Sequence, residues 1–115
     1  MAYDEKLAQR VREYLADARV TNVVEKLMFG GLAFLVNEKM CVNVNGERLM
    51  CRFDAKHHNR LASLPGFLDF YMSGRLIRGY CYVAPDAITT KASLKFWVDE
   101  CLAFNHKAES SKKQV

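Results

Sequence analysis

Several features that identify classes of protein are missing from this 115-residue sequence. It has no apolar run of about 18 residues, which excludes an ordinary transmembrane helix. Its first residues carry charge where a signal peptide would place an apolar core, so we expect a cytoplasmic protein with no membrane partner. No phosphate-binding loop and no nucleophile beside a recognisable base occurs. We therefore expect no catalytic residue and no cofactor.

Cysteine is present, but not at the spacing of a zinc or redox motif, so we expect no metal site. Cys51, Cys81 and Cys101 fall on predicted apolar faces, where they behave as small hydrophobic residues. Cys41 falls on the other face of its strand, and we expect it to be exposed.

The net charge of the chain is mildly basic. Lysine and arginine total 17 against 13 aspartate and glutamate, a formal charge of +4. Part of the excess lies in residues 107–113. Nucleic-acid binding produces such a balance, and so does a solubilising tail, so charge alone does not decide between them.

Half of the residues are hydrophobic, and no linker or repeat divides the chain. We predict one domain over residues 1–106 and a mobile basic tail over residues 107–115. The order of elements predicts an α+β fold. Its antiparallel sheet has about five strands, with N-terminal, middle and C-terminal helices packed mainly on one face.

Three helices are expected. Apolar residues spaced three and four apart predict a helix over residues 5–18. A short helix follows over residues 54–63, and a last helix begins at Thr90. His57 and His58 are adjacent in the short helix and point about 100° apart, so they cannot bind one metal ion together. We expect both at the surface.

The remaining apolar segments predict strands. Residues 23–29 form the first strand, Gly30 and Gly31 bend the chain, and residues 32–36 form the second. Residues 66–76 are expected to be a loop. The last strand, residues 77–83, places Ile77, Cys81 and Val83 on one face and Arg78, Tyr80 and Tyr82 on the other.

Between the second and last strands, Asn45–Gly46 is a strong signal for a hairpin with a two-residue turn. This register pairs Val44 with Glu47 and separates Cys41 from Cys51 across the sheet, which argues against a disulfide. One face then carries Met40, Val42, Val44, Leu49, Cys51 and Phe53. The opposite face carries Cys41, Asn43, Arg48, Met50 and Arg52.

Two surfaces are candidates for interaction. The segment Met28, Phe29, Gly30 and Gly31 is either a docking loop or a structural bend that lets the first two side chains enter the core. The second surface is a basic sheet face with interleaved aromatic residues. It consists of Arg48, Arg52, Arg75, Arg78, Tyr80 and Tyr82. Such a face can stack single-stranded nucleic acid, or its tyrosines can pack against a helix or a second subunit.

Three stretches of the sequence resemble the N-terminal domain of the TfoX/Sxy family. They are residues 1–13, residues 26–37 around Met28-Phe29-Gly30-Gly31, and the later landmarks Gly74-Arg75, Gly79-Tyr80, Trp97-Val98 and Ala103-Phe104. The resemblance covers residues 2–106. It implies a bacterial, cytoplasmic α+β domain. The namesake members regulate natural competence genes with the cyclic-AMP receptor protein at promoters. They carry a second, C-terminal domain, so this chain resembles a stand-alone form.

The leading functional hypothesis is a non-catalytic regulatory or adaptor domain that binds a protein partner, which the resemblance identifies as transcription machinery or a regulator. Direct nucleic-acid binding through the basic aromatic face is the first alternative. A second copy of the chain is a further candidate partner, because an aromatic face or an unpaired edge strand favours self-association. A small-molecule-binding domain or enzyme is the weakest alternative.

Overall fold

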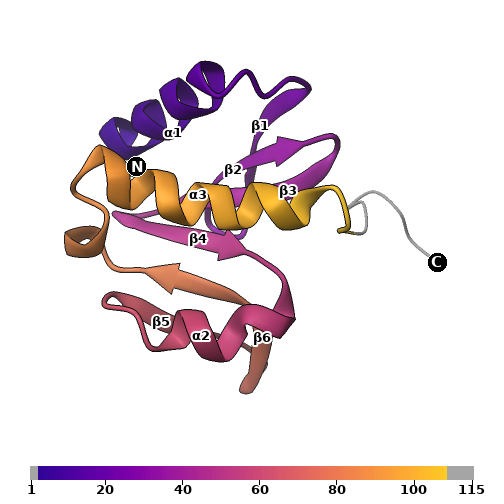
Figure 1. The fold of residues 1–115 in the computed structure, drawn as a ribbon, viewed down its shortest axis with the longest axis vertical. Helices are drawn as coiled ribbons and strands as arrows, with labels where there is room; N and C mark the ends of the chain where they lie inside the picture. Colours follow the sequence, from indigo (N-terminus) through magenta and orange to yellow (C-terminus); the bar gives the residue numbers. More distant parts are fainter. Residues whose placement is uncertain (1–2, 109–115) are drawn as a thin grey trace.

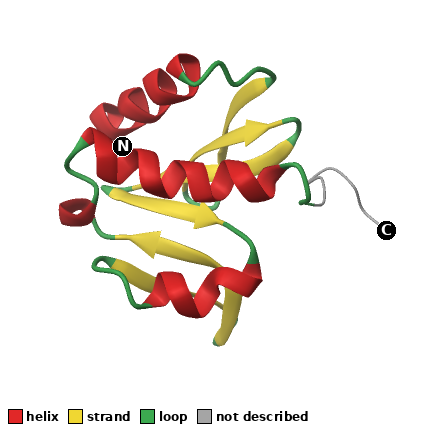
Figure 2. Ribbon diagram, in the orientation of Figure 1, coloured by secondary structure: helices red, strands yellow, loops and turns green. Residues whose placement is uncertain are grey.

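Within residues 3–108, which the computed structural model describes, three α-helices pack on one face of a six-stranded antiparallel sheet (Figures 1 and 2). The helices are α1 (Glu5–Asp17), α2 (His58–Ala62) and α3 (Lys91–Asn105), with short 3-10 turns η1 (Ala55–His57) and η2 (Pro85–Ala87). The strands are β1 (Val23–Met28), β2 (Gly31–Val36), β3 (Lys39–Asn45), β4 (Arg48–Arg52), β5 (Phe67–Met72) and β6 (Arg75–Val83). The predicted α+β class is confirmed, and the sheet has one strand more than expected.

Capping residues begin the two long helices. The Asp4 carboxylate accepts hydrogen bonds from the backbone N–H groups of Lys6 (2.8 Å) and Leu7 (3.3 Å). Thr90 and Ser93 form a capping box at the start of α3. Because such bonds satisfy N–H groups that have no partner in the first turn, both helices begin where the sequence predicts.

The strand order is β1-β2-β3-β4-β6-β5, so β1 and β5 are the two edges of the sheet. All neighbouring strands are antiparallel. The core between helices and sheet, here called the helix-side core, draws residues from all three helices and from the central strands. It includes Val11, Leu15, Phe34, Leu49, Leu61, Cys81, Trp97 and Val98.

Residues 67–72 form a strand, so the predicted loop over residues 66–76 was wrong. β5 and β6 make a hairpin whose turn residues, Ser73 and Gly74, both have positive φ (53° and 77°). The alternation of β5 is hidden in the sequence because the exposed residues Tyr71 and Met72 follow the buried Phe70. An apolar run of this kind has no period of two.

A bulge in β6 begins at Gly79, which has a φ of 91° that glycine adopts without steric cost. Its N–H donates a hydrogen bond to Nδ1 of His58 (3.2 Å), and its carbonyl accepts one from the N–H of Phe53 (2.8 Å). The His58 side chain is therefore buried, with Nε2 at 3.7 Å from Oδ1 of Asp69. The prediction of a surface histidine at this position was wrong.

The bulge also reverses the faces of the residues that precede it. Arg78 lies on the helix side and donates to Oδ1 of Asn59 at 3.3 Å. Ile77 instead packs on the opposite face with Tyr80 and Tyr82. The predicted faces of Arg78 and Ile77 were therefore wrong, because regular alternation assumes an uninterrupted strand.

The turn between β3 and β4 consists of Gly46 and Glu47, and Val44 pairs with Leu49. The predicted turn at Asn45–Gly46 and the pairing of Val44 with Glu47 were therefore wrong. Each pairing partner moves by two positions, so the side chains of β4 keep the faces predicted for them.

A second bulge changes the faces at the start of β3. The register of β2 with β3 shifts between Phe34 and Leu35, which leaves Cys41 as the extra residue. Cys41 turns into the helix-side core, to which Cys51 also belongs, and Met40 turns to the opposite face. The predictions of an exposed Cys41, of its separation from Cys51 and of Met40 on the helix-facing side were wrong.

The start of the predicted tail is attached to the domain. The N–H of Lys107 donates to the carbonyl of Phe104 (2.8 Å), and its Nζ lies 3.3 Å from Oδ2 of Asp54. The rest of that tail, from residue 109, lies outside the described residues. Across residues 3–108, no helix combines the length and apolar character needed to cross a membrane.

Candidate protein interface

The sheet face opposite the helices, here called the open face, has an apolar cluster of its own. Its buried members are Ala33, Leu35, Met40, Met50 and Phe70. The partly buried residues that pack against them are Met28, Ile77, Tyr80 and Tyr82. None of these residues belongs to a helix of the described part of the chain. The strands themselves therefore form this apolar cluster, and no helix of residues 3–108 contributes to it.

Aromatic and guanidinium groups are stacked on the open face. The ring centroid of Phe70 lies 5.5 Å from those of both Tyr80 and Tyr82. The guanidinium carbon of Arg48 lies 3.8 Å from the centroid of Tyr82, and that of Arg52 lies 5.8 Å from the centroid of Tyr80. Such contacts fix the arginines in place, because cation and ring face attract one another.

A chain of hydrogen bonds connects this stack to the β1–β2 turn. Nη2 of Arg48 donates to Oδ1 of Asn45 (3.3 Å), and Nδ2 of Asn45 donates to the carbonyl of Phe29 (2.8 Å). Nδ2 of Asn43 donates to the carbonyl of Met28 (2.8 Å). Two asparagines of β3 thus reach across β2 and hold the turn.

The asparagines can cross β2 because Gly31 has no side chain. A Cβ atom at Gly31 would lie 2.3 Å from the carbonyl oxygen of Val44 and 2.4 Å from Oδ1 of Asn43. Asn43 is fully buried, and its Oδ1 has no hydrogen-bond partner in the structure. Glycine is therefore required at position 31 because Val44 and Asn43 of β3 approach its backbone closely, and not because of an unusual φ.

The turn itself consists of Phe29 and Gly30, which both have positive φ (56° and 74°). This conformation suits a two-residue hairpin turn but is costly for an aromatic residue. The Phe29 side chain is 45% exposed, so the expectation that it enters the core was wrong. Met28 does pack against the open face.

Charge is segregated across the sheet. The cross-strand partner of Lys26 is Ala33, which places Lys26 on the open face together with Arg48 and Arg52. The acidic strand residues lie on the helix side, where Glu25 pairs with Arg12 and Asp69 faces His58. These placements leave the strand residues of the open face with cationic charge only.

Two exposed aliphatic residues extend the open face toward its edges. Val24 pairs with Leu35 and is 56% exposed, and Leu68 pairs with Tyr82 and is 42% exposed. Of the residues on this face, the tyrosines and arginines are of the types enriched in protein interfaces.

The structure therefore unites most of the predicted interaction residues. The β1–β2 turn, Arg48, Arg52, Tyr80 and Tyr82 contribute to one connected surface. Arg78 lies on the opposite side of the sheet, and Arg75 lies at the end of the β5–β6 hairpin.

Sequence reasoning missed five contributors to this surface: Val24, Lys26, Asn43, Asn45 and Leu68. Asn43 carried a signal, because it is an amide in a strand of otherwise apolar residues. The others depend on strand register, which only the three-dimensional pairing provides.

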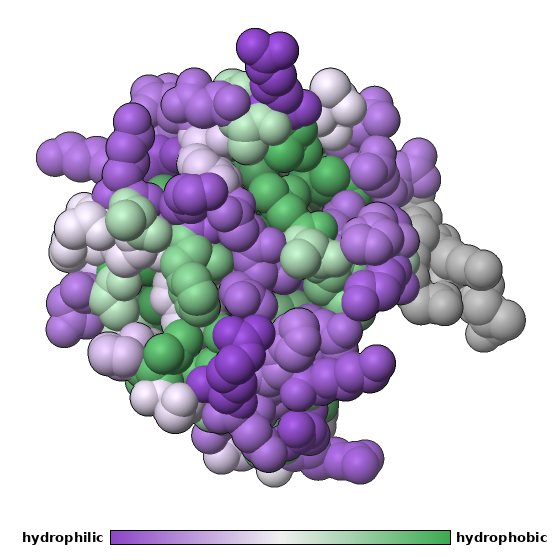
Figure 3. Space-filling model, viewed as in Figure 1, coloured by the Kyte–Doolittle hydropathy of each residue, from purple (hydrophilic) through white to green (hydrophobic). Residues whose placement is uncertain are grey.

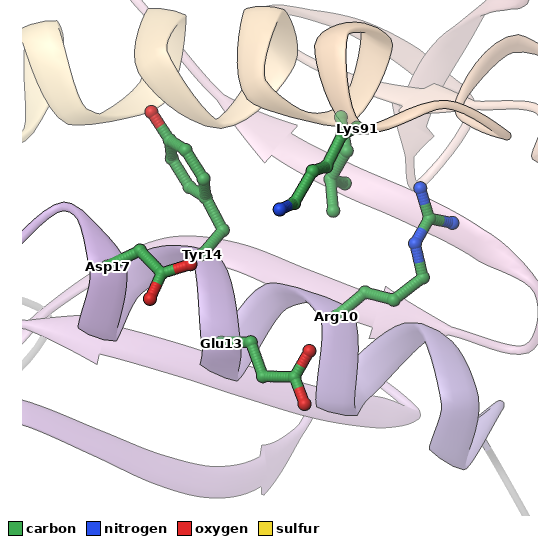
Figure 4. Close-up of a pocket in the computed structure, with 6 residues that line it drawn as sticks. Arg10, Glu13, Tyr14, Asp17 and Lys91 are labelled. Carbon is green, nitrogen blue, oxygen red and sulfur yellow. The ribbon is translucent and has the colours of Figure 1, made fainter.

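The helical side of the molecule has a different character. Viewed from this side, the surface is largely hydrophilic, with apolar patches among the helices (Figure 3). A hollow of about 100 Å³ lies between α1 and α3, where Arg10, Glu13, Tyr14 and Asp17 face Lys91 (Figure 4). This volume is below the range of about 300–1,000 Å³ that holds small-molecule ligands.

Two of the polar groups around this hollow, Arg10 and Tyr14, already have partners. Arg10 donates to the carbonyls of Ile88 (2.7 Å) and Thr90 (3.2 Å). The Tyr14 hydroxyl donates to Oδ1 of Asp99 at 2.5 Å. Burial raises the pKa of Tyr14, and so does the bond to Asp99, which keeps the phenol neutral. The hollow is therefore part of the helix packing, and its tyrosine is unsuited to act as a base.

Metal ligands do not cluster in the described residues. No group of three or more histidine, cysteine or carboxylate side chains in residues 3–108 has the geometry to hold an ion. Burial raises the pKa of both Cys41 and Cys51 well above the ordinary value, which keeps these thiols protonated.

Comparison with known proteins gives one match. The sequence profile of the TfoX N-terminal domain matches residues 13–105, and this range includes the complete sheet and the open face. No curated protein and no solved structure matches the chain.

Proposed function

Because the chain belongs to the TfoX N-terminal domain family, we propose that it is a non-catalytic regulatory or adaptor domain that binds a protein partner through the open face. The partner is a component or regulator of the transcription machinery in a bacterial cytoplasm, as the role of the family's namesake members suggests. The observation that carries this proposal is the open face itself: no helix of residues 3–108 packs on its apolar cluster, Val24 and Leu68 are exposed on it, and its charged strand residues are all cationic.

The arrangement of the tyrosines favours protein over nucleic acid as the partner. A base stacks on an open aromatic face. In this structure the Arg48 guanidinium covers a face of Tyr82, and Phe70 packs against both tyrosines. The exposed groups nearby, Val24 and Leu68, are aliphatic and fit the apolar residues of a protein.

Charge reversal on the open face tests the proposal. The double variant Lys26→Glu/Arg48→Glu reverses the charge of two of the three strand cations on the open face and leaves the five buried residues of its cluster unchanged. Lys6→Glu/Lys56→Glu is the matched control, because it changes the net charge equally at two exposed positions on the helical side. The wild-type protein is used to capture partners from native cells. Each captured protein is then purified and titrated against the wild type, the open-face variant and the control variant.

We expect a purified partner whose Kd rises about tenfold or more with the open-face variant and stays unchanged with the control. A partner that binds both variants equally well would overturn the assignment of this face. Duplex DNA, single-stranded DNA and RNA are titrated in parallel at about 50 and 200 mM salt. Saturable, salt-sensitive binding that only the open-face variant loses, without a protein partner, would establish nucleic-acid binding instead.

A further inference from the structure

The edge strand β1 offers a second element of recognition, continuous with the open face. Among residues 3–108, β1 pairs only with β2, over all six of its residues and without a bulge. The opposite edge, β5, has an irregular register and contacts α2. An uncovered and regular edge is a template for another strand.

The register of β1 determines which backbone groups face outward. The turn Phe29–Gly30 is closed by the pair Met28 and Gly31. In an antiparallel hairpin with a two-residue turn this closing pair is hydrogen-bonded, and bonded pairs then alternate along the ladder. The N–H and C=O groups of Val23, Glu25 and Leu27 therefore point away from β2.

The side chains of β1 show what an added strand would contact. Leu27 is 70% exposed, the highest value among the exposed large hydrophobic residues of the described chain, and Val24 is 56% exposed. Lys26 has no carboxylate partner among residues 3–108, whereas Glu25 is bound by Arg12 through Nε–Oε2 at 2.5 Å and Nη2–Oε1 at 2.7 Å. The free charge at this edge is thus positive.

A second copy of the chain fits this edge poorly. In a symmetric antiparallel pair, opposed residues must share a face, so residues of odd number oppose residues of odd number. The two registers that pair the most residues of β1 are centred on Glu25 or on Lys26. Each of them sets one of these residues opposite its own copy, and like charges directly opposed destabilise a sheet.

We propose that β1 binds an extended segment of the partner protein as a seventh, antiparallel strand, and that this segment has the pattern apolar-acidic-any-apolar. Backbone hydrogen bonds to Val23, Glu25 and Leu27 hold the segment. An acidic residue opposes Lys26, and apolar residues contact Val24 and Leu27. This inference rests on the proposed function, because Val24 and Lys26 belong to both surfaces and the partner would cover them together.

The probe for the test is a random library of 12-residue peptides, displayed on phage and selected against the wild-type domain. Selected peptides are synthesised, and the exchange of backbone amide protons of the domain is measured by NMR with and without each peptide. We expect peptides with the pattern apolar-acidic-any-apolar, and we expect protection on binding at residues 23, 25 and 27 but little change at residues 24 and 26, whose amides already bond to β2. This alternating protection is specific to strand addition.

Variants at Leu27 separate the backbone from the side chain. Leu27→Pro removes an outward N–H, which an edge strand tolerates, and Leu27→Thr is the matched control that keeps the N–H. We expect the peptide Kd to rise about tenfold or more with Leu27→Pro and about threefold or less with Leu27→Thr. Peptides N-methylated at alternate positions give the same test without altering the protein, should Leu27→Pro fail to fold.

Three results would overturn the inference: no selected peptide, selected peptides that lack acidic residues, or binding that leaves the amides of residues 23, 25 and 27 unprotected. The experiments distinguish failure of strand addition at β1 from failure of the open face as the interface. Peptides that lose affinity with Arg48→Glu but not with Leu27→Pro would retain the open face as the interface and reject strand addition. If peptides add to β1 but the captured partner protein binds Lys26→Glu/Arg48→Glu as tightly as the wild type, the open face would be rejected instead.

Discussion

Gly31→Ala tests whether close approach, and not backbone freedom, explains the paired glycines of the β1–β2 turn. The new methyl group would lie 2.3 Å from the backbone oxygen of Val44 and 2.4 Å from Oδ1 of Asn43. The Val44 oxygen belongs to a central strand of the sheet and cannot move without disturbing its ladder. The Asn43 amide can move, but only by giving up its bond to the Met28 carbonyl.

Both consequences contribute to the expected loss of stability. Overpacking of a rigid site costs about 1–3 kcal/mol. Loss of a buried hydrogen bond costs a further 0.5–1.5 kcal/mol or so. We therefore expect Gly31→Ala to lower the free energy of unfolding by about 2–4 kcal/mol, a large part of the stability of a domain of this size.

Gly30→Ala is the control, because a Cβ atom at Gly30 would lie 3.6 Å from Nδ2 of Asn45, an ordinary contact distance. Its cost comes only from the positive φ of 74° and should be about 1 kcal/mol. Urea denaturation of both variants, with the slope of the transition compared with that of the wild type, gives the two free energies. If Gly30→Ala proved the more destabilising of the two, backbone conformation would govern this turn and the argument from close approach would be refuted.

Three further predictions concern the core and the ion pairs. The four cysteines, Cys41 included, should react with a disulfide reagent only in denaturant, since all are buried; a rapidly labelled thiol in the native protein would contradict the structure. The hydrogen bond from Arg12 lowers the pKa of Glu25 below its ordinary value of 4.5. Its stabilising effect is therefore present above pH 4.5, is lost as the pH falls through the lowered pKa, and is at most about 1 kcal/mol because both side chains are solvent-accessible. Glu25→Gln should accordingly be less stable than wild type near neutral pH and equal to it in acid, as measured by thermal unfolding. His58→Phe should cost about 1–3 kcal/mol, because the N–H of Gly79 loses its buried acceptor; an unchanged urea midpoint would show that this bond contributes nothing.

Much of the candidate site was readable from residue types and local spacing. Arg48 and Arg52 share a face because each lies two residues from Met50 on β4, which is a regular strand. Tyr80 and Tyr82 share a face for the same reason. The two pairs meet because β6 crosses over to lie beside β4. That adjacency involves residues about 30 positions apart, and no local pattern specifies it.

The misassigned residues share one cause. Arg78, Ile77, Met40 and Cys41 all lie at or beside a bulge, where an odd number of extra residues in one strand reverses the alternation of faces. The bulge in β6 is stabilised by His58, which accepts the N–H of Gly79 from another element. A sequence contains the glycine that permits such a bulge, but the partner that fixes it comes from the fold.

By itself, the sequence determined the α+β class, the three helices and the membership of a family. The class and the helices follow from periodicity, capping and turn residues, which act over a few positions of the chain, whereas the family follows from the match of residues 13–105 to its sequence profile. Only the tertiary structure decided the sixth strand, the order of strands and the two bulges. It also decided the segregation of charge, with Lys26 and Arg48 on the open face and Glu25 and Asp69 beneath the helices. The reason is physical: the face that a strand residue occupies depends on its pairing with distant strands, and a single inserted residue is enough to change it.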